Sequence, residues 1–151
     1  MILWLCTACS LSEPAAGSLR EDYTGLAERL LLPPNTAAVR WMTRAADAAG
    51  SGGGRADARV YAWVATPGGA ASWLESTLGA AVGPRAHWVP DAVADVLFTP
   101  GELASLQRNE ARGSWKLACV RYPGIGIGRG DFGSGMVLDC GDHMYATLAA
   151  R

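Results

Sequence analysis

Positive charge is scarce and scattered in this sequence. The chain has a single lysine, Lys116, and its 13 lysine and arginine residues are balanced by 14 aspartate and glutamate residues, which gives a formal net charge of -1 at pH 7. Proteins that bind nucleic acid or anionic membrane surfaces do so through clustered Lys and Arg. The charge pattern therefore gives no reason to expect either partner.

Long apolar runs and histidines are also few. Half of the 151 residues are hydrophobic, which suits one domain with a buried core, but no run of about 20 apolar residues predicts a transmembrane helix. Zinc needs three or four ligands, and only the distant His87 could add an imidazole to the cluster of Asp139, Cys140, Asp142 and His143. We expect no metal and no cofactor, and a polar strand end with solvated carboxylates instead.

A catalytic arrangement is not evident either. The sequence has no G-x-S-x-G nucleophile elbow. The carboxylate pairs Asp91 with Asp95 and Glu102 with Glu110 could support hydrolysis if a cleft joined them to a histidine. A solvated helix face and a helix cap account for these residues more simply. We therefore expect a protein that is not an enzyme, with a small periplasmic envelope hydrolase as the alternative.

The strongest signal of location lies in the first ten residues, MILWLCTACS. An apolar segment is followed by two small residues and then by Cys9. This resembles the lipobox of bacterial lipoproteins, although Cys6 stands where that pattern usually has leucine. The resemblance implies a lipidated Cys9, loss of residues 1–8 with the signal peptide, and a lipid anchor in the cell envelope, in the outer membrane facing the periplasm.

Two expectations follow for the organisation of the chain. No basic residue precedes Arg20, so we expect the true start to lie upstream, with Met1 inside the apolar part of the signal peptide. Residues 9–17 then form a tether and residues 18–151 a single globular domain. The alternative is that the first residues form a short apolar strand in a cytosolic protein.

Two cysteines remain in the domain, Cys119 and Cys140, on strand-like segments that flank a glycine-rich stretch. A hairpin that pairs them places the loop centre at Arg129 and Gly130, in the middle of that stretch. Opposed positions of the non-hydrogen-bonded kind bring Cβ atoms to about 4.5 Å, close to disulfide reach. The sequence predicts a disulfide here, which favours an oxidising compartment. The alternative is two free buried thiols.

The periodicity of apolar residues predicts an α+β fold. We expect a small antiparallel sheet of about four strands, with helices packed on one face and a C-terminal disulfide-bridged hairpin. The irregular segment should be 83–98, which contains Pro84 and Pro90. The expected helices cover 18–31, 67–79 and a stretch from Thr99 to Gly113, and the expected strands cover 38–44, 59–66, 115–122 and 136–140, the last extended by 145–149.

Residues 123–135, PGIGIGRGDFGSG, are the one unusual local pattern. A phosphate-binding loop would need a lysine and a following helix, whereas a strand is expected here. The glycines suit a long hairpin loop, because they permit positive φ. A loop braced by a disulfide can also carry recognition. The candidate partner-binding residues are Ile125, Ile127, Arg129, Asp131 and Phe132.

The expected function is therefore that of a non-catalytic cell-envelope lipoprotein that binds a protein partner. One form of this is an immunity or inhibitor protein that blocks a toxin acting in the envelope. A structural assembly factor of an envelope complex is a further alternative to the hydrolase.

Mass spectrometry of the mature N-terminus tests the lipobox. We expect the first residue to be Cys9 carrying acyl chains, with residues 1–8 removed, because the resemblance implies processing at that position. A mature chain that retains residues 1–8, or that begins at an unmodified Cys9, would contradict the lipid anchor.

Overall fold

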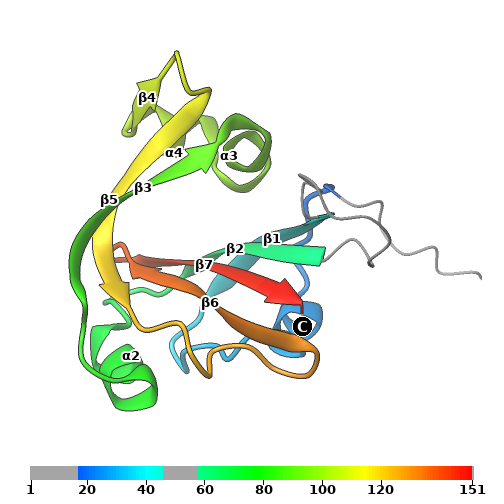
Figure 1. Ribbon diagram of the computed structural model, residues 1–151, viewed down its shortest axis with the longest axis vertical. Coiled ribbons are helices and arrows are strands. Elements are labelled where there is room, and N and C mark those ends of the chain that lie inside the picture. Colours follow the sequence, from blue (N-terminus) through cyan, green and yellow to red (C-terminus); the bar gives the residue numbers. More distant parts are fainter. Residues whose placement is uncertain (1–16, 46–57, 151) are drawn as a thin grey trace, which may run out of the picture.

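A computed structural model describes residues 17–45 and 58–150 of the chain. Seven strands form one antiparallel sheet, against which short helices pack (Figure 1). The strands are β1 (Ala38–Ala45), β2 (Ala58–Ala65), β3 (Gly83–Pro90), β4 (Gln107–Asn109), β5 (Ser114–Tyr122), β6 (Phe132–Asp139) and β7 (His143–Ala150). The helices are α1 (Tyr23–Ala27), α2 (Ala71–Leu78), α3 (Asp91–Leu97) and α4 (Pro100–Ala104). None of these helices is both long and apolar enough to cross a membrane.

The strand order is β1, β2, β7, β6, β5 and β3, with β4 paired to β5 off this path. β1 and β2 form a hairpin, in register from Ala38 opposite Ala65 to Ala45 opposite Ala58. The glycine-rich connection between them lies outside the described residues, as do Cys6, Cys9 and the tether up to residue 16.

The prediction of about four strands is wrong, partly because one predicted strand is two. β6 ends at Asp139 and the chain turns back into β7 at His143. The turn is held by the Asp139 carboxylate, which accepts a hydrogen bond of 3.2 Å from the Gly141 N–H, and Gly141 has a φ of +85°, which favours glycine. Gly141, directly before Asp142, is the signal in the sequence for the turn between β6 and β7.

The prediction of an irregular 83–98 segment is also wrong. Residues Gly83–Pro90 form β3, which pairs along its whole length with β5. Pro84 and Pro90 are tolerated because β3 is the last strand of the sheet and each proline lies near one of its ends. The long-range pairing with β5 therefore outweighs the local effect of the prolines.

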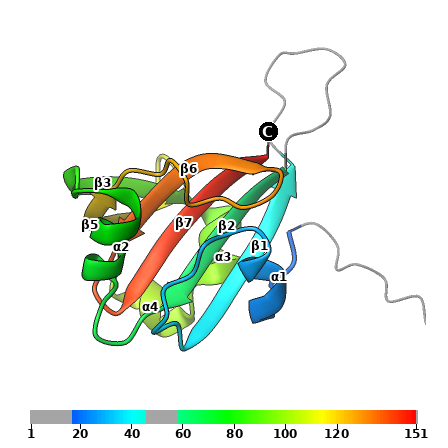
Figure 2. The ribbon, with the colours of Figure 1, turned by 90° about the horizontal axis from the view of Figure 1, so that it is seen from below.

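The prediction that the helices pack on one face of the sheet is wrong, because they lie on both faces. Figure 2, seen from below, shows α1 and α2 in front of the sheet, with α3 and α4 behind it. Buried residues alternate accordingly along the strands: Ala62 and Val64 pack with Leu26 of α1 and Leu74 of α2, whereas Trp63 packs on the other face. Both faces of the central strands are thus cores, and the apolar strand β2 is explained by burial on both sides.

The helix expected over 18–31 is restricted to Tyr23–Ala27. Asp22 caps it by accepting a hydrogen bond of 3.1 Å from the Gly25 N–H. Before the cap, Arg20 forms a bridge with Trp41 of β1, and beyond the helix Leu30 forms a bridge with Gly128. Tertiary backbone pairing at both ends leaves room for little more than one helical turn.

Two local helix predictions are confirmed more closely. α2 ends before Gly79, whose φ is +100°. α4 begins with the predicted capping box, in which the Thr99 and Glu102 side chains each accept a hydrogen bond from the other residue's N–H. α4 ends at Ala104, however, because the residues that follow form β4 against β5.

Candidate functional site

The glycine-rich segment is packed onto the body of the protein. Ile127 is fully buried, and its carbonyl accepts a hydrogen bond of 2.8 Å from the Leu31 N–H. Arg129 donates its own N–H to the Arg29 carbonyl at 2.8 Å and its guanidinium to the Ala27 carbonyl at 3.0 Å. This segment therefore covers the region of α1 instead of protruding.

The five predicted partner-binding residues do not share one exposed surface. Ile125 is 81% exposed, and Arg129 and Asp131 are also exposed. Phe132 is half-buried against the core, with the Arg29 guanidinium 5.9 Å from the centre of its ring. Ile127 and Phe132 thus serve packing, and the loop offers a partner little apolar surface beyond Ile125.

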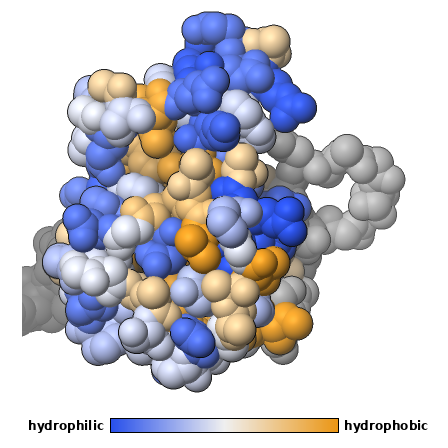
Figure 3. Space-filling model, turned by 90° about the vertical axis from the view of Figure 1, so that its left-hand side faces the viewer, coloured by the Kyte–Doolittle hydropathy of each residue, from blue (hydrophilic) through white to orange (hydrophobic). Residues whose placement is uncertain are grey.

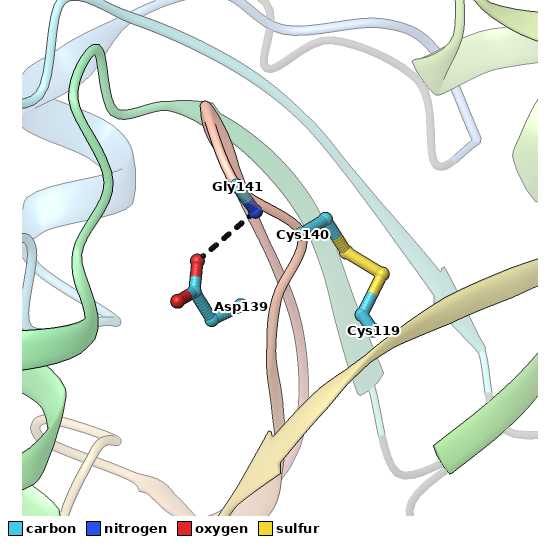
Figure 4. Close-up of a disulfide and its surroundings, with 4 residues drawn as sticks. All are labelled: Cys119, Asp139, Cys140 and Gly141. Atoms are coloured by element: carbon cyan, nitrogen blue, oxygen red, sulfur yellow. Dashed lines mark hydrogen bonds between the residues drawn. A yellow bond between two sulfur atoms is a disulfide. The ribbon is translucent and has the colours of Figure 1, made fainter. Parts of the chain in front are cut away.

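The predicted disulfide between Cys119 and Cys140 is present, with a Cα–Cα distance of 4.8 Å (Figure 4). The register also agrees with the sequence argument, because Val120 lies opposite Asp139 in the β5–β6 ladder. That ladder covers residues 120–122 of β5 only, and residues 114–116 pair on the same side with β4. The disulfide lies between these two pairings, next to the β6 ladder. Beyond it, β3 and β5 continue as a two-stranded ribbon that no longer pairs with β6.

A groove of about 460 Å³ lies at this point. Its walls are β3, β5 and the turn between β6 and β7, with the disulfide among the lining residues. The charged side chains along it are Arg85, Lys116 and Asp139. Figure 3 looks onto this side of the molecule and shows hydrophilic and hydrophobic residues interspersed, with the hydrophilic ones gathered at the end near β4.

A smaller pocket of about 270 Å³ lies beside α4. Trp63 forms its wall: the indole stacks on the His143 ring, with 4.6 Å between ring centres, and meets the Phe98 ring edge-on at 4.8 Å. Glu102 and the disulfide also line the pocket. A second cavity of about 140 Å³ shares the Trp63, Glu102 and His143 walls.

The Glu102 carboxylate is fully engaged within this pocket. It accepts hydrogen bonds from the Trp63 indole N–H and, at 3.0 Å, from the Thr99 N–H, and Arg40 lies 3.6 Å away. Burial raises the pKa of Glu102, but the hydrogen bonds and the nearby His143 lower it by more, so the pKa lies below the ordinary glutamate value. A carboxylate held ionised in this way is a poor proton donor or acceptor at neutral pH.

The other residues considered for hydrolysis are not gathered in this pocket. Asp91 forms an ion pair of 2.7 Å with Arg108, which also pairs with Glu110, and the Arg108 hydrogen bond lowers the pKa of Asp91. His87 lies against Tyr145, with 5.5 Å between ring centres, and burial, together with the charge of Arg121, lowers the pKa of His87. Asp91 and Glu110, one member of each pair expected to support hydrolysis, are thus held by the same arginine.

The cluster from Asp139 to His143 is likewise divided among structural contacts. Cys140 is oxidised, Asp142 accepts a hydrogen bond of 3.3 Å from the Gly68 N–H, and His143 stacks on Trp63. Within residues 17–45 and 58–150, no group of three or more His, Cys, Asp and Glu side chains is placed to hold a metal ion.

Comparison with protein-family models, with curated proteins and with solved structures gives no match for this chain. Its function is therefore argued from its own residues. Sequence reasoning missed the Trp63, Glu102 and His143 arrangement, because these residues come from three separate parts of the chain.

Glu102→Gln tests the electrostatics of this pocket. At pH 7 we expect the free energy of unfolding to fall by about 1 kcal/mol, because a charged hydrogen-bond acceptor becomes neutral. The lowered folded-state pKa means that the carboxylate stabilises the fold above its unfolded pKa of about 4.3 and loses this contribution as the pH falls through the folded value. Wild type and variant should therefore converge in acid.

Urea unfolding at pH 7 and pH 3 measures the difference. Glu21→Gln, at an exposed glutamate outside the pocket, is the matched control and should change stability little at either pH. An equal loss for Glu102→Gln at both pH values would show that charge is not the cause.

Proposed function

We propose that this chain is a non-catalytic cell-envelope lipoprotein that binds a protein partner. The observation that carries the proposal is the groove beside the disulfide, where β3 and β5 leave the rest of the sheet. Exposed residues of β3, among them Ala86, lie along it. This groove is open to solvent along the strands, and such an open surface suits contact with a macromolecule better than the enclosure of a small substrate.

The chemistry of the described residues supports binding over catalysis. Glu102 is held ionised by its hydrogen bonds, Asp91 is paired with Arg108, and the groove has Asp139 as its acidic residue. Asp139 is also engaged, since it accepts the Gly141 N–H. These structural contacts of Glu102, Asp91 and Asp139 favour the binding protein over the hydrolase.

The location in the envelope rests on two features. The Cys119–Cys140 disulfide supports an oxidising compartment, because such bonds are rare in reducing cytosol. The lipobox-like sequence around Cys9 supports a lipid anchor in the outer membrane facing the periplasm. An immunity or inhibitor protein for an envelope toxin fits this location, and so does an assembly factor.

Site-specific photo-crosslinking in the organism that carries the gene tests the proposal. A photoreactive residue in place of Ala86, in the groove, should give a discrete protein adduct, because a bound partner would lie against this residue. Ala37 is the matched control, since it is also an exposed alanine but precedes β1 at the opposite edge of the sheet.

Mass spectrometry of the adduct identifies the partner. A protein adduct at position 86 and none at position 37 is the expected result. The absence of any protein adduct at position 86, or equal adducts at both positions, would contradict partner binding at the groove.

A further inference from the structure

The two edges of the sheet differ in how they are covered. At β1, the preceding segment forms backbone hydrogen bonds: the Gly17 N–H donates to the Thr43 carbonyl at 2.7 Å, and Arg20 and Trp41 exchange bonds of 2.8 and 2.9 Å. β3 ends the strand order on the other side, and within the described part of the chain no strand pairs with its outer edge. Unpaired N–H and C=O groups along an edge can pair with an added strand.

The length of the free edge is set by two prolines. Pro84 and Pro90 lack N–H groups. The N–H groups of a strand point alternately to its two edges, and the Asp91 N–H, which continues the register, donates to the Gly113 carbonyl beside β5. Between the prolines, the N–H groups of Ala86 and Trp88 therefore point to the free edge. Arg85 and Ala86 are exposed, whereas Val89 is buried. An added strand of about five residues would match residues 85–89, which lie between the two prolines.

The side chains beside this edge are predominantly cationic. Arg85 lies opposite Cys119, so Arg121 is its diagonal neighbour on the same face of the β3–β5 ladder. On the other face, Lys116 lies opposite Trp88. Within the described residues, none of these three cations forms an ion pair. Arg85 and Lys116 line the groove together with Asp139.

We propose that β3 accepts an extended, acidic segment of the partner protein as an additional antiparallel or parallel strand. This deepens the proposed function, on which it rests, by giving the chemistry of the partner. Residues of an added strand alternate between the faces of the sheet. One acidic side chain would therefore lie near Arg85 and Arg121, and a second, an odd number of residues away, near Lys116.

A second copy of this chain is the weaker occupant of the same edge. Pairing of two β3 strands would bring Arg85 and Arg121 of one copy near the same cations of the other copy, and these like charges would repel each other. Charged residues and prolines on an edge strand discourage self-association. The same residues that oppose a second copy would attract an acidic strand.

Fluorescence anisotropy with synthetic peptides tests this inference. The probes are labelled extended peptides with two glutamates three residues apart and varied residues elsewhere, each compared with its lysine counterpart. The acidic peptides should bind and the lysine peptides should not, and added salt should weaken binding. In the double variant Arg85→Glu with Arg121→Glu, we expect a loss of affinity of roughly tenfold or more.

Two controls separate strand addition from simple attraction of charge. Arg59→Glu makes, at one exposed arginine on β2, the substitution that the double variant makes at each of its two positions, and it should leave binding unchanged. Two sets of peptides, methylated on the odd-numbered or on the even-numbered backbone nitrogens, separate the edges of the added strand. The set whose methyl groups face β3 should not bind, while the set whose methyl groups face away from β3 should still bind. Amide hydrogen exchange should slow at Ala86 and Trp88 of the protein, whose N–H groups point to the free edge, when the peptide is bound.

The inference is overturned if no acidic peptide binds, if both methylated sets bind equally, or if Arg59→Glu weakens binding as much as the double variant. Binding of a single-stranded oligonucleotide as tight as that of the acidic peptides would also overturn it, as would dimerisation of the free protein through β3. A protein adduct at position 86 combined with failure of the peptides would remove strand addition and leave the proposed function standing.

Discussion

The Cys119–Cys140 disulfide is the constraint on which the arrangement of this protein depends. β5 pairs with β3 along its length, but it meets β6 only at residues 120–122. The bond lies at the end of that short ladder and joins the β3–β5 ribbon to the turn that begins β7. A cross-link that closes a loop of about 20 residues contributes about 3 kcal/mol in the chain-entropy description. Its position matters as much as its magnitude, because the groove and the pocket beside α4 both have this bond in their walls.

The central strands and the helices on both of their faces form the core of the protein, whereas β3 and the groove beside it remain a surface available for contact. The central strands are buried on both faces, and the chain's own residues cover the β1 edge. Acidic groups in the body serve structure: Glu102 holds Trp63 and caps α4, and Asp91 holds Arg108. Beside the β3 edge, Arg85, Lys116 and Arg121 form no ion pair with any residue that the structure describes. The account of a binding protein follows from this distribution, in which these acidic groups are paired and the cations beside the β3 edge are not.

Features set by neighbouring residues could be predicted from the sequence, and features set by distant pairing could not. The Thr99 and Glu102 cap needs only four residues, and the register of Cys119 against Cys140 follows from the loop between them. By contrast, β3 forms because β5 lies beside it, and α1 is short because Arg20 and Leu30 pair with distant strands and loops. The burial of Ile127 could not be predicted for the same reason, since it is produced by contacts with a segment about 100 residues away in sequence.

Amide hydrogen exchange on the double variant Cys119→Ser with Cys140→Ser tests the role of the disulfide most directly. The account predicts that exchange accelerates roughly tenfold or more in β3 and in residues 114–119 of β5, where the ribbon has left β6, while β2 and β7 keep their protection. Unchanged exchange in the ribbon, or an equal acceleration throughout the sheet, would contradict the claim that this bond holds the binding edge in place.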